Sequence, residues 1–166
     1  MKVNPGRYRA EIEGDFVVFL IGMRINQPWR LRDWWFVFTA MPKMIKELEA
    51  RPEMGMLHAS QGLFYGGPAL VQFWRSFEHL ERYARGADSL HLPAWRKFNQ
   101  RVRDSGTVGI WHETFKVRAG EYESIYGNMP RVGLATAAEH SPLGSTSTAA
   151  RRIGAREEDT APVAPY

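Results

Sequence analysis

The stretch FVVFLIGMRI, residues 16 to 25, decides the fold of this chain. It is rich in β-branched and aromatic residues and lies between Gly14-Asp15 and Asn26-Gln27-Pro28, which are turn-forming sequences, so it is predicted to form a β-strand. A half-exposed strand would alternate between apolar and polar residues, whereas this one is apolar almost throughout. We therefore expect both of its faces to be buried.

A helix is expected after this strand, because the apolar residues that follow recur every three or four positions. Asp33 can cap the start of that helix, Pro42 is expected to kink it, and Pro52 closes it just after Arg51. The predicted apolar stripe consists of Trp34, Phe38, Met41, Ile45 and Leu48.

The rest of the ordered chain predicts two more strands, a helical region and a last strand. MLHASQGLFY (56–65) and ALVQFW (69–74) are predicted strands joined by the turn GGP, and a helix runs from Phe77 to near Gly86. A second helical piece begins at Pro93, TVGIWHETFKV (107–117) is a strand, and YESIY (122–126) is a further strand or an extended arm.

This order of elements predicts an α+β fold, the ferredoxin-like split βαβ arrangement. Such a fold is an antiparallel sheet with its helices on one face only. Since the strand at 16–25 is apolar on both sides, we expect the uncovered face to pack against a second copy of the chain, giving a homodimer.

Composition sets the limits on domains and chemistry. The 166 residues are 44% hydrophobic and 24% charged, which indicates one globular domain over 1–135. From 136 to 166 the chain turns to Ser, Thr, Ala, Gly and Pro, so a flexible low-complexity tail is expected there. The chain has no cysteine, which excludes disulfides, thiol nucleophiles and iron–sulfur clusters.

Partners and location are predicted largely from what the sequence lacks. The first residues have no signal-peptide core, and the longest apolar run is far shorter than the ~20 residues of a membrane-spanning helix, so we expect a cytoplasmic protein without membrane association. The net charge of +4 is scattered among acidic residues, which argues against nucleic-acid binding. Neither G-x-G-x-x-G nor G-x-x-x-x-G-K-[ST] occurs, which argues against a tightly bound dinucleotide or nucleoside triphosphate.

Four segments carry a resemblance to a known family: WRSFEHLERYAR (74–85), HLPAWRKFN (91–99), WHETF (111–115) and YESIYGNMP (122–130). They resemble the dimeric α+β barrel superfamily in its antibiotic-biosynthesis monooxygenase branch. More closely, they look like the family typified by the fungal monooxygenase of fumagillin biosynthesis, many bacterial members of which have no assigned substrate. The resemblance covers roughly Phe16 to Leu134.

The resemblance implies a small monooxygenase, an oxidoreductase of secondary metabolism, with a pocket between sheet and helices in each protomer. It would oxidise a small apolar, terpenoid- or polyketide-like substrate with dioxygen, without a cofactor. Two alternatives stay open. One is a haem-binding enzyme of the same fold, either haem-degrading or aldoxime-dehydratase-like; the other is a non-catalytic module that binds a small ligand.

Three residues are candidate catalytic groups. His91 precedes a helix, where its imidazole can act as a base, or alternatively cap the helix. His112 and Glu113 are adjacent on a strand and so point to opposite faces. Glu113 shares its face with aromatic residues, where burial would raise its pKa as a general acid or base requires; the alternative is an ion pair with Arg24 or Arg75. For His112 the alternative is a core histidine bonded to a backbone carbonyl.

Aromatic and polar side chains complete the candidate site. Trp74, Trp95 and Tyr65 can line a cavity, although aromatic residues at such spacing are more often plain core. Tyr126 and Asn128 enter only through the family pattern. The predicted substrate-binding set is Trp74, Trp95, Tyr65, Tyr126, Asn128 and Arg24. No metal-binding pattern stands out, and a haem would take His79, His91 or His112, or less readily His58, as its axial ligand.

Overall fold

The computed structural model describes residues 1–144 and 148–153, and the chain divides into two compact units. The central unit is Val17–Lys116. The terminal unit combines Met1–Phe16 with Val117–Tyr166. Within the described part of the chain, none of the helices has both the length and the apolar character needed to span a bilayer.

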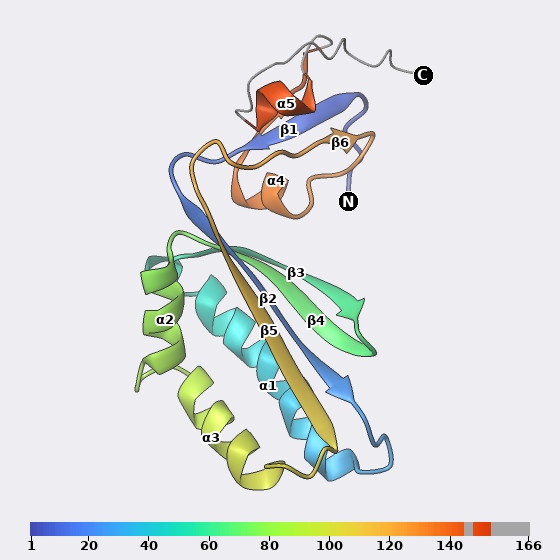
Figure 1. Cartoon of the computed structure of the whole chain (residues 1–166), viewed down its shortest axis with the longest axis vertical. Helices are drawn as coiled ribbons and strands as arrows, with labels where there is room; N and C mark the ends of the chain where they lie inside the picture. The colour runs from blue at the N-terminus through green and yellow to red at the C-terminus, as the bar shows by residue number, and fades with distance from the viewer. Residues whose placement is uncertain (145–147, 154–166) are drawn as a thin grey trace. The chain divides into compact units, whose positions relative to one another are not determined.

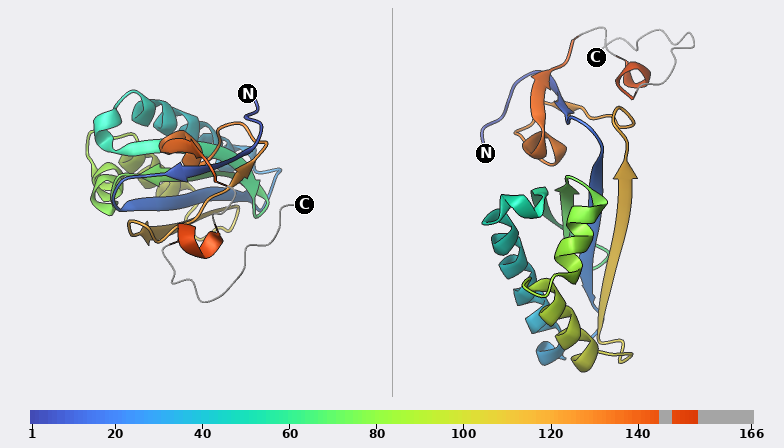
Figure 2. Two further views of the ribbon diagram at one scale, coloured as in Figure 1. Left: turned by 90° about the horizontal axis from the view of Figure 1, so that it is seen from above. Right: turned by 90° about the vertical axis from the view of Figure 1, so that its left-hand side faces the viewer.

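The central unit is a four-stranded sheet with α1, α2 and α3 on one of its faces (Figure 1; Figure 2, right). The strands lie in the order β3-β4-β2-β5, and β4 is antiparallel to both β2 and β3. In chain order the elements are β2 (Phe16–Ile25), α1 (Leu31–Glu49), a 3₁₀ turn (Pro52–Met54), β3 (Met56–Phe64), β4 (Gly67–Trp74), α2 (Phe77–Arg85), α3 (His91–Arg101) and β5 (Val108–Val117). This is the ferredoxin-like arrangement, so the predicted fold class is confirmed.

The β2–β4 register shows which side chains face the helices. Val17 pairs with Trp74, and both belong to a core cluster with Leu48 of α1 and Leu80 of α2. A second core cluster, around Met23, Val37, Val102 and Val108, lies toward the other end of the unit. Because side chains alternate along a strand, every second residue of β2 and β4 faces α1–α3.

The strand residues that alternate with these helix-facing ones form the opposite face of the sheet, which we call the open face. Gly22 lies there under the indole of Trp111: a Cβ on Gly22 would stand 2.8 Å from that ring, so only glycine fits. Val18 and Leu20 are only half-buried there. The open face comprises Val18, Leu20, Gly22 and Arg24 of β2, His58, Ser60 and Phe64 of β3, Ala69, Val71 and Phe73 of β4, and Trp111, Glu113 and Phe115 of β5.

Two local details of the central unit differ from expectation. Asp33 lies inside the first turn of α1 and accepts a hydrogen bond from Arg30, instead of capping the helix. The β3–β4 hairpin turns at Tyr65-Gly66, one residue before the predicted turn. Both turn residues have positive φ, 51° and 84°, as a tight two-residue hairpin requires. The first residue of β4, Gly67, must be glycine because a side chain there would collide with the Met23 carbonyl oxygen.

The terminal unit contains a small sheet in the order β6-β1-β7. β1 (Arg7–Glu11) pairs antiparallel with β6 (Tyr126–Gly127) and with β7 (Glu139–Pro142). Helices α4 (Leu134–Ala137) and α5 (Ala149–Arg152) complete it. Leu134 and Ala135 are buried, and the ring of His140 stacks on Tyr8.

The terminal unit changes the expected domain boundaries. Residues 139–142 form a paired strand where a flexible tail was predicted from residue 136, and residues 1–16 join this unit instead of the ferredoxin-like one. The physical reason is that β7 is held by backbone hydrogen bonds to β1, which a Ser- and Pro-containing sequence of low apolar content does not reveal. Positions 145–147 and 154–166 of the predicted tail lie outside the described residues.

Candidate functional site

A cavity of about 610 Å³ lies in the central unit between the sheet and the three helices. Every strand and every helix of the unit contributes to its walls. The walls are mainly apolar, with Phe19 and Ile21 from β2 facing Met41 and Met44 from α1. Methionine is flexible and polarisable, so such a wall adapts to ligands of irregular shape. A cavity of this size and polarity fits a small organic molecule.

The polar groups in these walls are few and come from four elements. They are Gln61 of β3, Glu81 of α2, His91 of α3, and His112 and Thr114 of β5. A pocket with a small number of polar side chains among apolar ones orients a ligand through those groups. Each of the two imidazoles has two ring nitrogens, so each can donate one hydrogen bond and accept another.

His91 is the first residue of α3, two residues before the predicted helix start at Pro93. Its Nδ1 lies 2.9 Å from the backbone carbonyl oxygen of Ala84 in α2. A carbonyl oxygen can only accept, so Nδ1 carries the proton of this hydrogen bond. In the neutral ring Nε2 then has a free lone pair. His91 therefore lines the cavity as a proton acceptor of defined tautomer.

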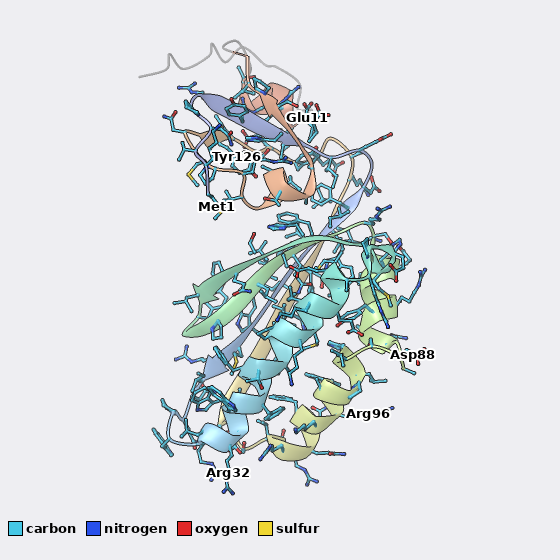
Figure 3. The ribbon with its side chains drawn as sticks, turned by 180° about the vertical axis from the view of Figure 1, so that it is seen from behind. Met1, Glu11, Arg32, Asp88, Arg96 and Tyr126 are labelled. Atoms are coloured by element: carbon cyan, nitrogen blue, oxygen red, sulfur yellow. The ribbon has the colours of Figure 1, made fainter. Side chains whose placement is uncertain are left out.

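A partly buried carboxylate, that of Glu47, holds the turn between α2 and α3 that precedes His91; Asp88 marks this turn in Figure 3. Glu47 of α1 accepts hydrogen bonds from the Tyr83 hydroxyl at 2.9 Å and from the Leu90 backbone N–H at 3.0 Å. Arg51 lies 3.7 Å away on the other carboxylate oxygen. Burial, together with the bond to Glu47, raises the pKa of Tyr83 far above its ordinary value, so it remains a donor at all working pH values. Glu47 thus ties α1 to α2 and to the residue before His91.

His112 also lines the cavity, from β5. Its ring centroid lies 5.6 Å from that of Phe19 on the neighbouring strand β2. The side chain is exposed, in contrast to the core histidine that the sequence left open as an alternative. His112 and His91 enter the cavity from different elements and so can contact different parts of a ligand.

Three predicted site residues lie away from the cavity: Glu113 and Arg24 on the open face, and Tyr65 at the β3–β4 hairpin turn. Glu113 is exposed there, since His112 on the same strand takes the cavity side. Arg24 donates to the Tyr65 carbonyl oxygen at 3.3 Å and to Asn26. Tyr65 is 64% exposed at the hairpin turn, with its ring edge-on to Trp111. These residues are not brought together with His91.

The two tryptophans have different positions. Trp95 of α3 lines the cavity, is 43% exposed, and stacks on Phe98, so it forms an outer wall. Trp74 is 1% exposed in the core, where its indole N–H donates to Gln72 Oε1 at 2.9 Å. Trp74 contacts only a small recess beside the cavity, which is described below.

Tyr126 and Asn128 belong to the terminal unit, where both bind its backbone. Tyr126 is labelled in Figure 3. The Tyr126 hydroxyl accepts from the Ala135 N–H, and burial raises the pKa of that hydroxyl. Asn128 adopts a positive φ of 53°, and its side-chain oxygen accepts from the Gly6 N–H at 2.9 Å. The walls of the cavity come wholly from the central unit.

The sequence missed most of the wall residues because it assigned them to the core. Phe38, Met41 and Ile45 were predicted as one apolar stripe of α1, and they do face inward. Periodicity shows which side of a helix faces the interior, but not whether the space beyond it is filled. Glu47 gave no signal at all, since a single glutamate in a helix usually points to solvent.

The fold and the cavity define a class: a ferredoxin-like α+β protein with an internal apolar pocket containing two histidines. The chain belongs to the Monooxygenase af470-like family, whose model matches residues 16–134. The family assignment of the sequence analysis is therefore confirmed.

Two individual proteins show how far the likeness extends. The chain is 32% identical over 126 residues to "Monooxygenase af470" of Aspergillus fumigatus, a match that covers 70% of this chain and 44% of that protein. The chain thus spans less than half the length of this curated relative. A dimeric protein of unknown function with a ferredoxin-like fold from Bacteroides fragilis aligns over 62% of this chain and 95% of its own, at 14% identity and a TM-score of 0.42, which is too low to build on.

Proposed function

We propose that the chain is a monooxygenase that oxidises a small apolar, terpenoid- or polyketide-like molecule with dioxygen and without a cofactor. The observation that carries this proposal is the His91 imidazole, with Nε2 as its free acceptor, in the wall of a cavity of about 610 Å³ that is otherwise largely apolar. Membership in the Monooxygenase af470-like family supports the reaction class. His91 is the base, and Trp95 is a wall of the substrate pocket.

The reaction suits a substrate with an acidic CH₂ group next to a carbonyl or phenol system. His91 Nε2 removes one proton from that carbon, and the carbanion passes an electron to dioxygen. The carbon radical and superoxide combine to form a C–O bond, and the protonated peroxide then loses its remaining C–H proton as the O–O bond breaks. The balance is R₂CH₂ + O₂ → R₂C=O + H₂O. The substrate supplies all four electrons, so no external reductant enters.

The apolar walls also contribute to this chemistry. A dry cavity stabilises a localised negative charge far less than water does. It therefore favours substrates whose carbanion spreads the charge over several rings. His112 and Thr114 supply polar contacts from β5 to a developing oxyanion.

Haem binding is the second candidate, because the same hydrogen bond favours it. An imidazole whose Nδ1–H is held by a backbone carbonyl presents Nε2 as a ligand of fixed orientation, which is the usual arrangement of metal-bound histidines. His91 would hold the haem through Nε2, and the haem would supply one-electron and oxygen chemistry.

One experiment separates these possibilities. The purified chain is titrated with haemin while the visible spectrum is recorded, and oxygen uptake is measured with a set of enolisable polycyclic phenols. We expect no saturable haemin binding, and oxygen uptake that falls roughly 100- to 10,000-fold in His91→Gln. A Soret band that shifts in His91→Gln would favour the haem protein. Ligand binding with no oxygen uptake under any condition would favour a non-catalytic module.

A further inference from the structure

We propose that a small recess beside the cavity is a binding site for dioxygen, an inference that rests on the proposed function. The recess has a volume of about 50 Å³. It adjoins the large cavity and shares nine wall residues with it: Phe19, Ile21, Met41, Met44, Ile45, Leu70, Leu80, Ala84 and His91. Its remaining walls are among the most buried side chains of the chain: Leu48, Gln72, Trp74 and Tyr83.

The volume of the recess restricts its occupant to a very small molecule. By the same measure of cavity space one water molecule needs about 10–15 Å³, so about 50 Å³ accommodates roughly three to five non-hydrogen atoms. A substrate with one or more rings is excluded from the recess and must occupy the cavity of about 610 Å³. The two spaces therefore divide the reactants by size.

The polarity of the recess favours an apolar occupant over water. A buried water needs about two to four polar partners, and empty apolar cavities stay dry and take up gases such as xenon. The Trp74 N–H is taken up by Gln72 Oε1 and the Tyr83 hydroxyl proton by Glu47, each at 2.9 Å. The Nδ1–H of His91 is taken up by the Ala84 carbonyl, so this ring offers a water molecule only the Nε2 acceptor. The remaining wall residues are all apolar: Phe19, Ile21, Met41, Met44, Ile45, Leu48, Leu70, Leu80 and Ala84.

The position of the recess completes the argument. His91 borders both spaces, so a gas molecule in the recess lies beside the base that generates the carbanion. Holding dioxygen next to the substrate carbanion removes the need for the two reactants to meet by diffusion within the protein. Dioxygen is the apolar diatomic molecule that the proposed reaction consumes.

Dissolved dioxygen is paramagnetic, so its location can be measured in the unmodified protein. We expect methyl relaxation in NMR to increase several-fold more for Leu48, which lines the recess alone, than for Val37, which lines the large cavity alone, or for Val102, when oxygen replaces nitrogen. Val102 is the matched control, because it is 1% exposed in the other core cluster and lines neither space. Xenon should compete for the site. Equal relaxation at all three residues, or a nuclear Overhauser effect from water to the Leu48 methyls, would overturn the proposal.

A pair of variants links the site to turnover. Leu48→Phe fills the recess and should raise the KM for oxygen several-fold while leaving the substrate Kd unchanged. Ala94→Val narrows only the large cavity, so it should raise the substrate Kd and leave the KM for oxygen unchanged. Should Leu48→Phe fail to fold, the relaxation measurement on the wild-type chain still decides. Gas in the recess without any oxidation would sustain this site and refute the proposed function, whereas oxidation with no gas in the recess would refute this site alone.

Discussion

The tautomer of His91 is a property that a single hydrogen bond determines. Because the Ala84 carbonyl accepts from Nδ1 at 2.9 Å, the neutral ring should carry its proton on Nδ1. Long-range ¹H–¹⁵N correlation spectra, recorded where the ring is neutral, should therefore show an Nδ1–H imidazole. The His112 ring makes no hydrogen bond with the described residues and serves as the comparison. A proton on Nε2 of His91 would remove it as the proposed base.

His58, on the open face of the sheet, should make the fold sensitive to mild acid. Burial lowers the pKa of His58 below its ordinary value of 6.5, and the carboxylate of Glu49 only partly opposes this. The unfolded chain then takes up the proton first, so the free energy of unfolding should fall as the pH drops below 6.5. Above 6.5 the ring is neutral in both states and this contribution to stability is complete.

The measurement for His58 is chemical denaturation across this pH range, with His58→Gln as the control. The variant has no proton to take up at this position, so its stability should change less between neutral and mildly acidic pH. If both proteins lose stability to the same extent, another group is responsible.

The sequence predicts which residues of a strand share a face, because side chains alternate along the strand. It does not predict which of the two faces the helices cover, because that depends on the packing of the whole unit. The sequence placed His112 and Glu113 on opposite faces of one strand, and the structure does so too. It could not tell which face the helices cover, and so gave Glu113 a weight that its exposed position does not support. His91 was found because it precedes a helix, but its partner Ala84 lies in a different helix and gives no sequence signal.

The contact between α1 and the α2–α3 turn depends on Glu47. Replacing it with alanine leaves the Tyr83 hydroxyl and the Leu90 N–H without their acceptor, which should cost about 1–3 kcal/mol of stability. Tyr83→Phe removes one of the two bonds and should cost about 1 kcal/mol. Since Leu90 precedes His91, we also expect Glu47→Ala to lower kcat.

The matched control is Glu49→Ala, an exposed carboxylate two residues further along the same helix. It should leave the melting temperature and kcat nearly unchanged. In a double-mutant cycle, Glu47→Ala and Tyr83→Phe should not be additive, because they remove the same hydrogen bond. Full additivity would show that the two side chains act independently.

Strong local signals made whole elements predictable. The strand at 16–25 was predicted with both of its ends, because turn-forming residues bracket a continuous apolar run. The strands β1, β6 and β7 were not defined as such, since they have only two to five residues and pair through their backbones. Short strands of this kind acquire their structure from partners more than a hundred residues away, as the Arg7–Gly127 pairing shows.

The open face of the sheet carries none of the three helices of the central unit. Its apolar residues include Leu20 and Val71 at the centre, with Phe115 half exposed near one edge. Apolar patches of this kind usually mark an interface. Arg24 and Glu113 place opposite charges on the same face. In a two-fold symmetric dimer, Arg24 of each copy can approach Glu113 of the other copy, because every contact across such an interface occurs twice.

We therefore predict a homodimer that buries this face, with light scattering after size exclusion reporting twice the mass of one chain. Leu20→Lys puts a charge at the centre of the interface and should give a monomer whose circular dichroism is unchanged. Trp29→Lys alters an apolar residue that is 74% exposed outside the sheet, and it should remain a dimer. A wild-type chain that is monomeric at high concentration would mean that the half-buried residues of β2 face solvent or another partner. The cavity walls lie on the other side of the sheet, so a monomeric Leu20→Lys should still bind ligand, which separates assembly from the pocket.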